Sequence, residues 1–468
     1  MQLFFSRKLM IIKFIATSLV LVYTLVASDK KQYQYISPVP NSKYISPSTS
    51  IIIRFTQISP KDLTNLLSFI QIHGEVSGIH PGKTKIAKDG KTIIFRPDNN
   101  FTLGEEVHVV LSPKSKPSKK CNIEKLTYHF KISSSTIEHQ NQPSENFDLN
   151  NGSEMKKLNL KMMTNQPVIM ENGVSVPSSF PFINVTINNN PSEDYIFINN
   201  WVPPNYNIIF DNSGSPVWYL HTADWDRRRD FKVQENGMIT MMIRGGYGRP
   251  NYDSESNWGF IGFDQNFTII DTFRATNGYY TDEHELLVLP DSGYFLIGRK
   301  DEPIDMSEYV EGGNPDATVR ETCIQEFTSD GELIFQWRAW DHYDIRDLES
   351  ESLLASYIRF PHMNAICIDD DQNILLSSRH LSEITKINRK TGDIIWRMSG
   401  APKNNQFEFI GDDLNGFRIQ HSIHALGNNH YLLYDNGNLH NPPQSRAVEY
   451  LIDTVSSPMT ASLVWEYR

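Results

Sequence analysis

The sequence has few cysteines and no excess of positive charge. Its 468 residues include three cysteines, Cys121, Cys323 and Cys367, whose wide spacing provides neither a disulfide framework nor the cysteine pairs of a structural zinc site. The formal net charge is -11, which argues against non-specific nucleic-acid binding, because that binding needs a basic surface. A nucleotide-binding motif is also absent, since the stretch RGGYGRP from Arg244 lacks the Lys-Ser/Thr pair of a phosphate-binding loop.

Long apolar runs and sustained helical periodicity are absent as well. No run approaches the ~20 residues of a membrane-spanning helix. The longest run, residues 14–27, follows Arg7, Lys8 and Lys13 and ends in small residues, which predicts a signal peptide over residues 1–28. We therefore expect a periplasmic or secreted protein with no membrane span after signal removal. An N-terminal anchor that is not cleaved is the alternative.

Short strand-like runs dominate residues 29–135. SIIIRFTQ, KTIIFRPD, EEVHVVLSP and LTYHFKIS are rich in Ile, Val, Phe and Thr and are separated by turn residues. The spacing predicts a small β-sandwich, and the pattern GKTIIFRPDNNFTLGEEVHVVL resembles bacterial immunoglobulin-like modules. The sequence shows no clustered acids, bases or metal ligands here, so the predicted role is spacing or docking. Residues 136–175 are polar and predict a linker.

Residues 176–468 repeat a pattern. A turn, two or three apolar residues and a tryptophan recur around Trp218, Trp337, Trp396 and Trp465, with Phe273 at the corresponding place in the remaining unit. Each unit continues into a second hairpin-like motif, as in ELLVLPDSGYFLIG. About four strands per unit of ~50 to 70 residues is typical of a β-propeller, so the expected fold class is all-β.

Three histidines occupy equivalent places in successive units. His284, His362 and His421 each come shortly before the second apolar run of a hairpin motif. In a propeller this strand lies near the central channel, so the three side chains should face one volume, with Asn364 and Arg379 beside His362. Each histidine alone is an ordinary polar residue at a strand end, but three in phase predict a site.

The repeat region resembles the bacterial aryl-sulfate sulfotransferases. The resemblance rests on HELLVLPDSGYFLIG, FPHMNAICIDDDQNILLSSRH, ITKINRKTGDIIWRMSG, QHSIHALGNNHYLLYDNG and SRAVEYLIDTVSS, in this order. It implies a six-bladed propeller without a metal or cofactor, and a ping-pong transfer of a sulfuryl group from a phenolic sulfate ester to a phenol. His421 corresponds to the nucleophile that becomes sulfated, and His284, His362, Asn364 and Arg379 to residues that hold the sulfuryl group.

The chemistry of sulfuryl transfer needs these residue types. A sulfate ester spreads its negative charge over three oxygens, and Arg379 offers them a planar, permanently charged pair of donors. Asn364, His284 and His362 can donate N–H groups, and a neutral imidazole is a competent nucleophile. Four nearby aromatic residues either stack on a phenol or pack in the core: Trp258, Tyr279, Tyr280 and Phe360.

The sequence departs from the family in two places. The loop before His421 lacks the cysteine pair that some members carry, and the sequence ends at LVWEYR, where members continue. We therefore expect either an incomplete last blade or a closing strand from FPFINVTINN.

The alternative functions are a metal-dependent propeller lyase or lactonase, in which the histidines bind a cation, and a surface-binding propeller that is not an enzyme.

Overall fold

The computed structural model describes residues 32–112, 123–135, 168–170, 172–200, 204–222, 228–243 and 258–468. The predicted signal peptide and most of the predicted linker lie outside these residues. The described chain is all-β, as the sequence predicts, with one short helix, α2 (Pro60–Leu66), and five 3-10 turns: η1 (Leu67–Phe69), η3 (Met306–Glu308), η4 (Ala339–Asp341), η5 (Ile345–Asp347) and η6 (Arg379–Leu381).

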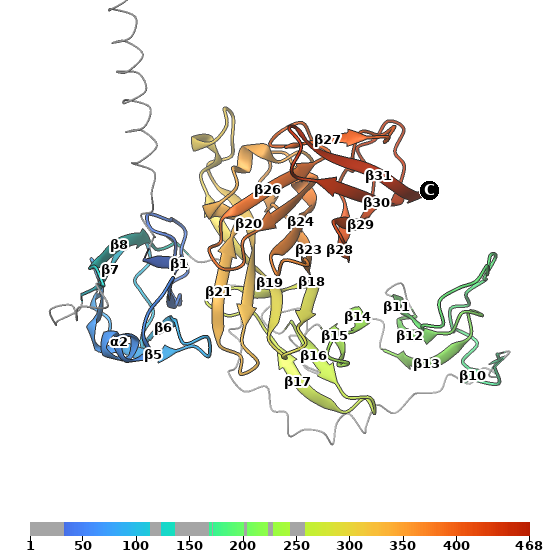
Figure 1. The fold of residues 1–468 in the computed structure, drawn as a ribbon, viewed down its shortest axis with the longest axis horizontal. Coiled ribbons are helices and arrows are strands. Elements are labelled where there is room, and N and C mark those ends of the chain that lie inside the picture. The colour runs from blue at the N-terminus through green and yellow to red at the C-terminus, as the bar shows by residue number, and fades with distance from the viewer. Residues whose placement is uncertain are drawn as a thin grey trace, which may run out of the picture.

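The N-terminal module, residues 32–135, contains two four-stranded sheets (Figure 1). One has the order β1 (Tyr33–Ser37), β2 (Ile51–Phe55), β6 (Thr92–Pro97), β5 (Gly82–Ile86), and the other β4 (Gly78–Ile79), β3 (Ile70–Gly74), β7 (Glu106–Leu111), β8 (Leu126–Lys131). Both sheets contribute to one apolar core, in which Ile53 of β2 and Val107 and Phe130 of the second sheet are buried. Alternation along β7 explains this, since every second residue faces the core.

Residues 196–467 form five successive sheets in the described chain. The first sheet contains β11 (Ile196–Asn200), β12 (Tyr206–Phe210) and β13 (Pro216–His221). The second contains β14 (Arg229–Val233), β15 (Ile239–Ile243), β16 (Gly259–Phe263) and β17 (Ile269–Phe273). The third contains β18 (Tyr280–Val288), β19 (Tyr294–Ile304), β20 (Ala317–Phe327) and β21 (Leu333–Arg338), with β22 (Tyr357–Phe360) paired to β20. The fourth sheet contains β23 (Met363–Ile368), β24 (Ile374–Ser378), β25 (Glu383–Ile387) and β26 (Ile394–Ser399). The fifth contains β28 (His421–Gly427), β29 (His430–Asp435), β30 (Arg446–Asp453) and β31 (Met459–Tyr467), with β27 (Phe407–Ile410) paired to β31.

The repeated aromatic residues lie on the last strand of each sheet. Trp218, Phe273, Trp337, Trp396 and Trp465 belong to β13, β17, β21, β26 and β31 respectively, which confirms the repeat read from the sequence. The first strands of successive sheets lie side by side, β11 against β14, β14 against β18, β18 against β23 and β23 against β28. Residues at the start of these strands are therefore brought together.

The last sheet is not short of a strand, so the expectation of an incomplete last blade is wrong. Four antiparallel strands, β28 to β31, make this sheet, because the tryptophan strand closes a unit rather than opening the next one. The described sheet with three strands is the first, β11 to β13. The stretch FPFINVTINN, residues 181–190, is in no strand, and its Phe182 and Ile187 are exposed, so it supplies no closing strand.

The end of the predicted linker packs on the first sheet. β9 (Val168–Ile169) pairs with β10 (Ser175–Val176), and the Asn172 side chain donates to the Pro216 carbonyl at 3.0 Å. Val176 is buried in the same apolar cluster as Tyr206 and Phe210. Packing against the repeat region thus begins by Met170, within the predicted linker.

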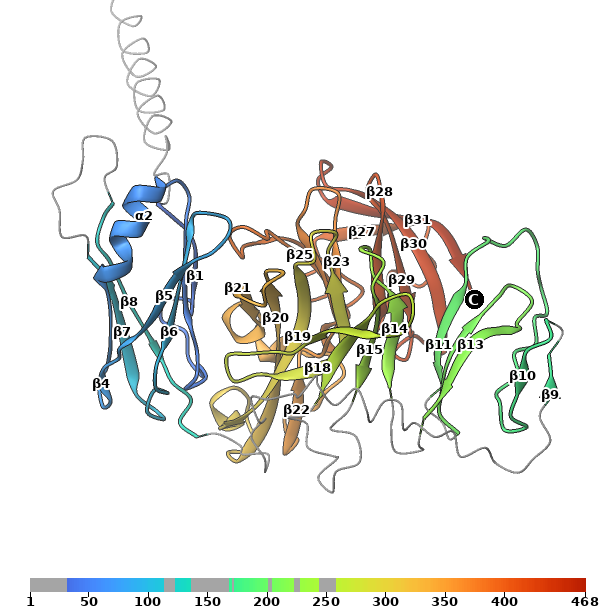
Figure 2. The ribbon, with the colours of Figure 1, turned by 90° about the horizontal axis from the view of Figure 1, so that it is seen from below.

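Side chains of the N-terminal module contact the repeat region directly. The Tyr35 hydroxyl donates to the Gln336 carbonyl at 2.6 Å, and the buried Arg54 guanidinium donates to the carbonyls of Ile334, Arg389 and Lys390 at 3.1 to 3.3 Å. The sheet that contains β1 and β2 faces the repeat region, while β7 and β8 lie on the opposite side of the module (Figures 1 and 2).

Candidate active site

The three predicted histidines meet on three neighbouring first strands. His284 lies within β18, His362 lies directly before β23, and His421 lies at the start of β28. The ring nitrogens of all three lie within 4.8 Å of one another, and the Nε2 atoms of His284 and His362 are 3.4 Å apart. The repeat therefore brings together residues that are up to 137 positions apart in sequence (421 minus 284).

Irregular backbone geometry, with register shifts and a positive φ, accompanies the three histidines. The register of β18 with β19 shifts between Thr281 and Leu286, and that of β28 with β29 shifts between His421 and His424. His362 has a positive φ of 63°, and its carbonyl accepts from the Arg379 amide at 3.0 Å. Positive φ is costly for a residue with a side chain and is maintained only where the surroundings enforce it, most often at functional sites.

Asp282 orients His284 and sets its charge. The Asp282 carboxylate is 2.5 Å from Nδ1 of His284 and is itself buried. Burial lowers the pKa of His284, but the negative charge of Asp282 outweighs burial, so the pKa lies above its usual value. Burial also raises the pKa of Asp282, yet the charge and hydrogen bond of His284 hold that pKa well below its usual range. His284 is thus the histidine best suited to carry a proton at neutral pH.

His421 is the opposite case. Burial, together with the positive charges of His284 and Arg379, lowers the pKa of His421 to about 4. Its Nδ1 is buried and has no hydrogen-bond partner within the described residues. Burial and His284 also hold the pKa of His362 well below its usual value. Within one site, the pKa of His284 is therefore raised while the pKa values of His362 and His421 are lowered.

Arg379 adds a positive charge that no carboxylate neutralises directly. It begins the turn η6, which follows β24, and its side chain is half-buried. Across the part of the chain that the structure describes, its guanidinium makes no hydrogen bond and no ion pair. Burial, followed by the charge of Arg359, lowers the pKa of Arg379, but an arginine stays charged at any ordinary pH. A half-buried, unpaired guanidinium beside neutral imidazoles is suited to an anion.

Asn364 points its amide at protein rather than at the histidines. It is buried, and Nδ2 donates to the Gln420 carbonyl at 2.8 Å, directly before His421. The Gln420 side chain in turn donates to Ser377 and to the carbonyl of Glu383. Asn364 thus ties the start of β28 to β23, and its role as a sulfuryl ligand stays a prediction.

Sequence reasoning missed Asp282 and His380. Asp282 stands two residues before His284 in DEHEL, so the two share a strand face, which is a signal that could have been used. The ring of His380 lies 4.5 Å from that of His362, and its Nδ1 lies 3.0 Å from the Arg359 carbonyl. Burial lowers the pKa of His380 to about 3, so it is a further neutral ring behind the site.

The four aromatic residues considered for phenol stacking do not form a common site with the three histidines. Phe360 is buried against Trp340, with ring centroids 4.9 Å apart, and the Tyr279 hydroxyl donates to Glu321 at 2.8 Å. Trp258, Tyr279 and Tyr280 line a cavity of about 500 Å³ between the N-terminal module and the repeat region. Because none of the three histidines lines this cavity, these rings do not form a phenol site together with them.

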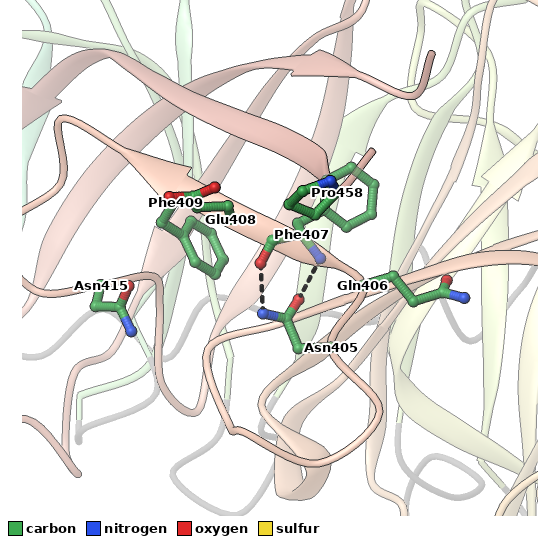
Figure 3. A pocket seen from close by; sticks show the side chains of 7 residues that line it. All are labelled: Asn405, Gln406, Phe407, Glu408, Phe409, Asn415 and Pro458. Atoms are coloured by element: carbon green, nitrogen blue, oxygen red, sulfur yellow. Dashed lines mark hydrogen bonds between the residues drawn. The ribbon is translucent and has the colours of Figure 1, made fainter. Parts of the chain in front are cut away.

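A second hollow, of about 580 Å³, lies on the last sheet beside β27 (Figure 3). Its lining includes Asn405, whose side chain is hydrogen-bonded to the backbone of Phe407, together with Glu408 and Pro458. The lining contains no histidine and no cationic side chain, so it does not match the sulfuryl-transfer site expected from the sequence.

No helix in the described ranges combines the length and the apolar character needed to cross a membrane.

Comparison with curated proteins finds no match. Among solved structures, a streptogramin B lyase is 13% identical with a TM-score of 0.31, over 62% of this chain and 86% of that chain. A virginiamycin B lyase from Staphylococcus aureus is 11% identical with a TM-score of 0.27, over 60% and 71%.

The LD-transpeptidase LdtMt1 is 13% identical with a TM-score of 0.16, over 21% of this chain, which spans only 38% of the transpeptidase. At such TM-scores these likenesses support no conclusion about this chain. The model of the family described as arylsulfotransferase (ASST) matches residues 163–468, and this range contains every residue of the candidate site. Since the match spans more than half of the chain, the protein belongs to the arylsulfotransferase family, a family of transferases.

Proposed function

We propose that the protein transfers a sulfuryl group from a phenolic sulfate ester to a phenol, in two steps through a sulfohistidine at His421. The observation that carries the proposal is the combination of a neutral His421 with the unpaired charge of Arg379 at the meeting point of three strands. A neutral imidazole supplies an electron pair, and a guanidinium binds the sulfuryl oxygens in a two-pronged manner.

In the first step a ring nitrogen of His421 attacks the sulfur. A nitrogen–sulfur bond forms, the bond from sulfur to the phenolic oxygen breaks, and the phenoxide leaves with the electron pair. Arg379 and His362 stabilise the charge on the sulfuryl oxygens, and the imidazolium of His284, held by Asp282, gives its proton to the phenoxide.

In the second step the acceptor phenol attacks the same sulfur. Its proton passes to His284, which is now neutral, and the nitrogen–sulfur bond breaks with its electron pair returning to His421. The products are a new phenolic sulfate ester and the enzyme in its starting protonation state. No nucleotide and no metal takes part.

The proposal includes three features of the whole protein. The five described sheets, with their first strands side by side, support a propeller, for which the family resemblance implies six blades. The two sheets of the N-terminal module support an immunoglobulin-like sandwich. The apolar segment at residues 14–27 supports export to the periplasm or secretion.

Transfer is tested with a chromogenic aryl sulfate and a second phenol, without any nucleotide. We expect release of the chromogenic phenol to depend on the acceptor, and the sulfate to appear on the acceptor. Binding of both compounds without turnover would instead support the surface-binding function.

A metal-dependent lyase or lactonase is the second candidate, because three imidazole nitrogens within 4.8 Å of one another also fit a cation. Arg379 counts against it, since a guanidinium beside a metal is costly unless an anion lies between them. Loss of activity on chelation that zinc restores would favour this function. Sulfuryl transfer that is unaffected by chelation would exclude it.

A further inference from the structure

A second cluster of histidines and carboxylates lies on the outer face of the N-terminal module. In the pairing of β7 with β8, His108 lies directly opposite His129, and Glu106, two residues before His108, is on the same face. One side-chain oxygen or nitrogen of each of these three residues lies within 4.8 Å of the others. The expectation that this module has no clustered metal ligands is therefore wrong, because the cluster depends on strand register.

The two oxygens of Glu106 each face one imidazole. Oε1 lies 3.2 Å from Nε2 of His108, and Oε2 lies 3.9 Å from Nε2 of His129. The Glu75 carboxylate, just after β3, lies 3.7 Å from the same nitrogen of His108. In a tetrahedral zinc site with ligand bonds of ~2.0 to 2.2 Å, neighbouring ligand atoms are about 3.3 to 3.6 Å apart. The separations of 3.2 to 3.9 Å between carboxylate oxygens and imidazole nitrogens are close to this value. The two imidazole rings, whose centroids are 5.8 Å apart, must rotate toward each other to complete the site.

We propose that Glu106, His108 and His129 bind a zinc ion, with Glu75 or a water as the fourth ligand. Two imidazoles select a first-row transition metal over Ca²⁺ or Mg²⁺, which prefer oxygen ligands alone. The backbone that carries the three ligands is fixed, since Val107 and Phe130, which alternate with them, are buried in the module core. The side chains are 36 to 43% exposed, so a metal can reach them.

The site is separate from the proposed sulfuryl-transfer site. β7 and β8 lie on the side of the module turned away from the repeat region (Figures 1 and 2). Zinc at this site should therefore stabilise the module without changing transfer. The experiment must nevertheless separate the two clusters, because the three histidines of the repeat region could also bind zinc.

The test is titration of the metal-free full-length chain with Zn²⁺ by isothermal calorimetry. We expect the double variant His108→Ala/His129→Ala to lose one equivalent of zinc that a His362→Ala variant retains. His430→Ala is the matched control, because His430 also pairs with a surface carboxylate, Glu449, at 2.7 Å, but no second imidazole from the described part of the chain joins that pair. It should bind zinc like the wild type, and all module variants should keep sulfuryl transfer.

Glu106→Gln provides a second variant in case the double variant does not fold. It keeps the shape of the side chain but loses the charge, and it should weaken zinc binding by more than about 100-fold, beyond the loss typical for residues that only support a ligand. Unchanged zinc stoichiometry and affinity in the module variants would overturn the proposal. Equal loss in the His430→Ala control would also overturn it.

Discussion

At the scale of single residues, the account depends first on the guanidinium of Arg379. Arg379→Lys keeps the charge but loses the planar pair of donors, so we expect turnover to fall by about 10²- to 10³-fold while the reaction still passes through the same intermediate. Arg359→Lys is the matched control, since that side chain is 49% exposed and paired with Glu351. Equal losses in the two variants would show that Arg379 has no special place in the reaction.

The pH dependence should separate the two kinds of histidine. His421 must be neutral, and with its pKa lowered to about 4, sulfation should stay fast down to pH 5 and decline only toward pH 4. His284 should act as the proton donor, and its pKa is raised by Asp282. Asp282→Asn removes that charge, so kcat should fall roughly 10- to 100-fold and the alkaline limb should move to lower pH. An alkaline limb that does not move in this variant would exclude His284 as the donor.

The residues of the site were predictable to the extent that they share one place in the repeat. His284, His362 and His421 could be found because each lies in, or directly before, the first strand of a sheet. His380 could not, because its contact with His362 depends on how the turn η6 folds back onto the loop before β23. The same reason applies to Asn364, since its bond to the Gln420 carbonyl joins two sheets.

At the scale of elements, the repeated tryptophan of the third sheet, Trp337, ties that sheet to the fourth. Trp337 is 1% exposed, and its Nε1 donates to the Gly392 carbonyl in the turn before β26 at 2.9 Å. Trp337→Phe removes this donor and leaves a small cavity, which should cost about 1 to 3 kcal/mol of unfolding free energy. Trp465→Phe should change it by less than about 0.5 kcal/mol, because Trp465 is 48% exposed. Chemical denaturation measures both, and equal losses would contradict this role of Trp337.

Strand number and phase were readable from the sequence because turn residues and apolar runs alternate regularly. In GNNH, residues 427–430, for example, Asn428 and Asn429 both adopt positive φ in the hairpin between β28 and β29, as such a turn requires. The sequence did not indicate whether the tryptophan strand is the last strand of one sheet or the first strand of the next, because the same motif fits both positions. The pairing of His108 with His129 could not be predicted either, because it depends on the register between two strands, which neither strand's sequence specifies alone.

At the scale of the whole molecule, buried neutral histidines make stability depend on pH. Burial is the main cause that lowers the pKa of His342 to about 4, of His380 to about 3 and of His421 to about 4. Below pH 6.5 the unfolded chain binds protons that the folded chain excludes, so stability falls with falling pH, by on the order of 2 kcal/mol for each histidine at pH 5. His284 has a raised pKa and acts in the opposite direction, with its contribution complete below pH 6.5 and lost at higher pH. Calorimetry should show a lower Tm at pH 5 than at pH 8, and an equal or higher Tm would contradict these burial effects.

The association of the two parts of the molecule had no signal in the sequence. Arg54 follows three isoleucines in a strand-like stretch of the module, yet it donates to three carbonyls that lie more than 250 residues further along the chain. Only the folded repeat region creates that set of acceptors.

The most direct test of the central claim is intact-mass spectrometry of the protein after brief reaction with an aryl sulfate and quenching without acid. We expect one added sulfuryl group that maps to His421, that disappears when a phenol acceptor is added, and that is absent from His421→Asn. His284→Ala and His362→Ala should form the same adduct more slowly. A sulfuryl group on His421→Asn, or one that maps to His284 or His362 in the wild type, would contradict the account.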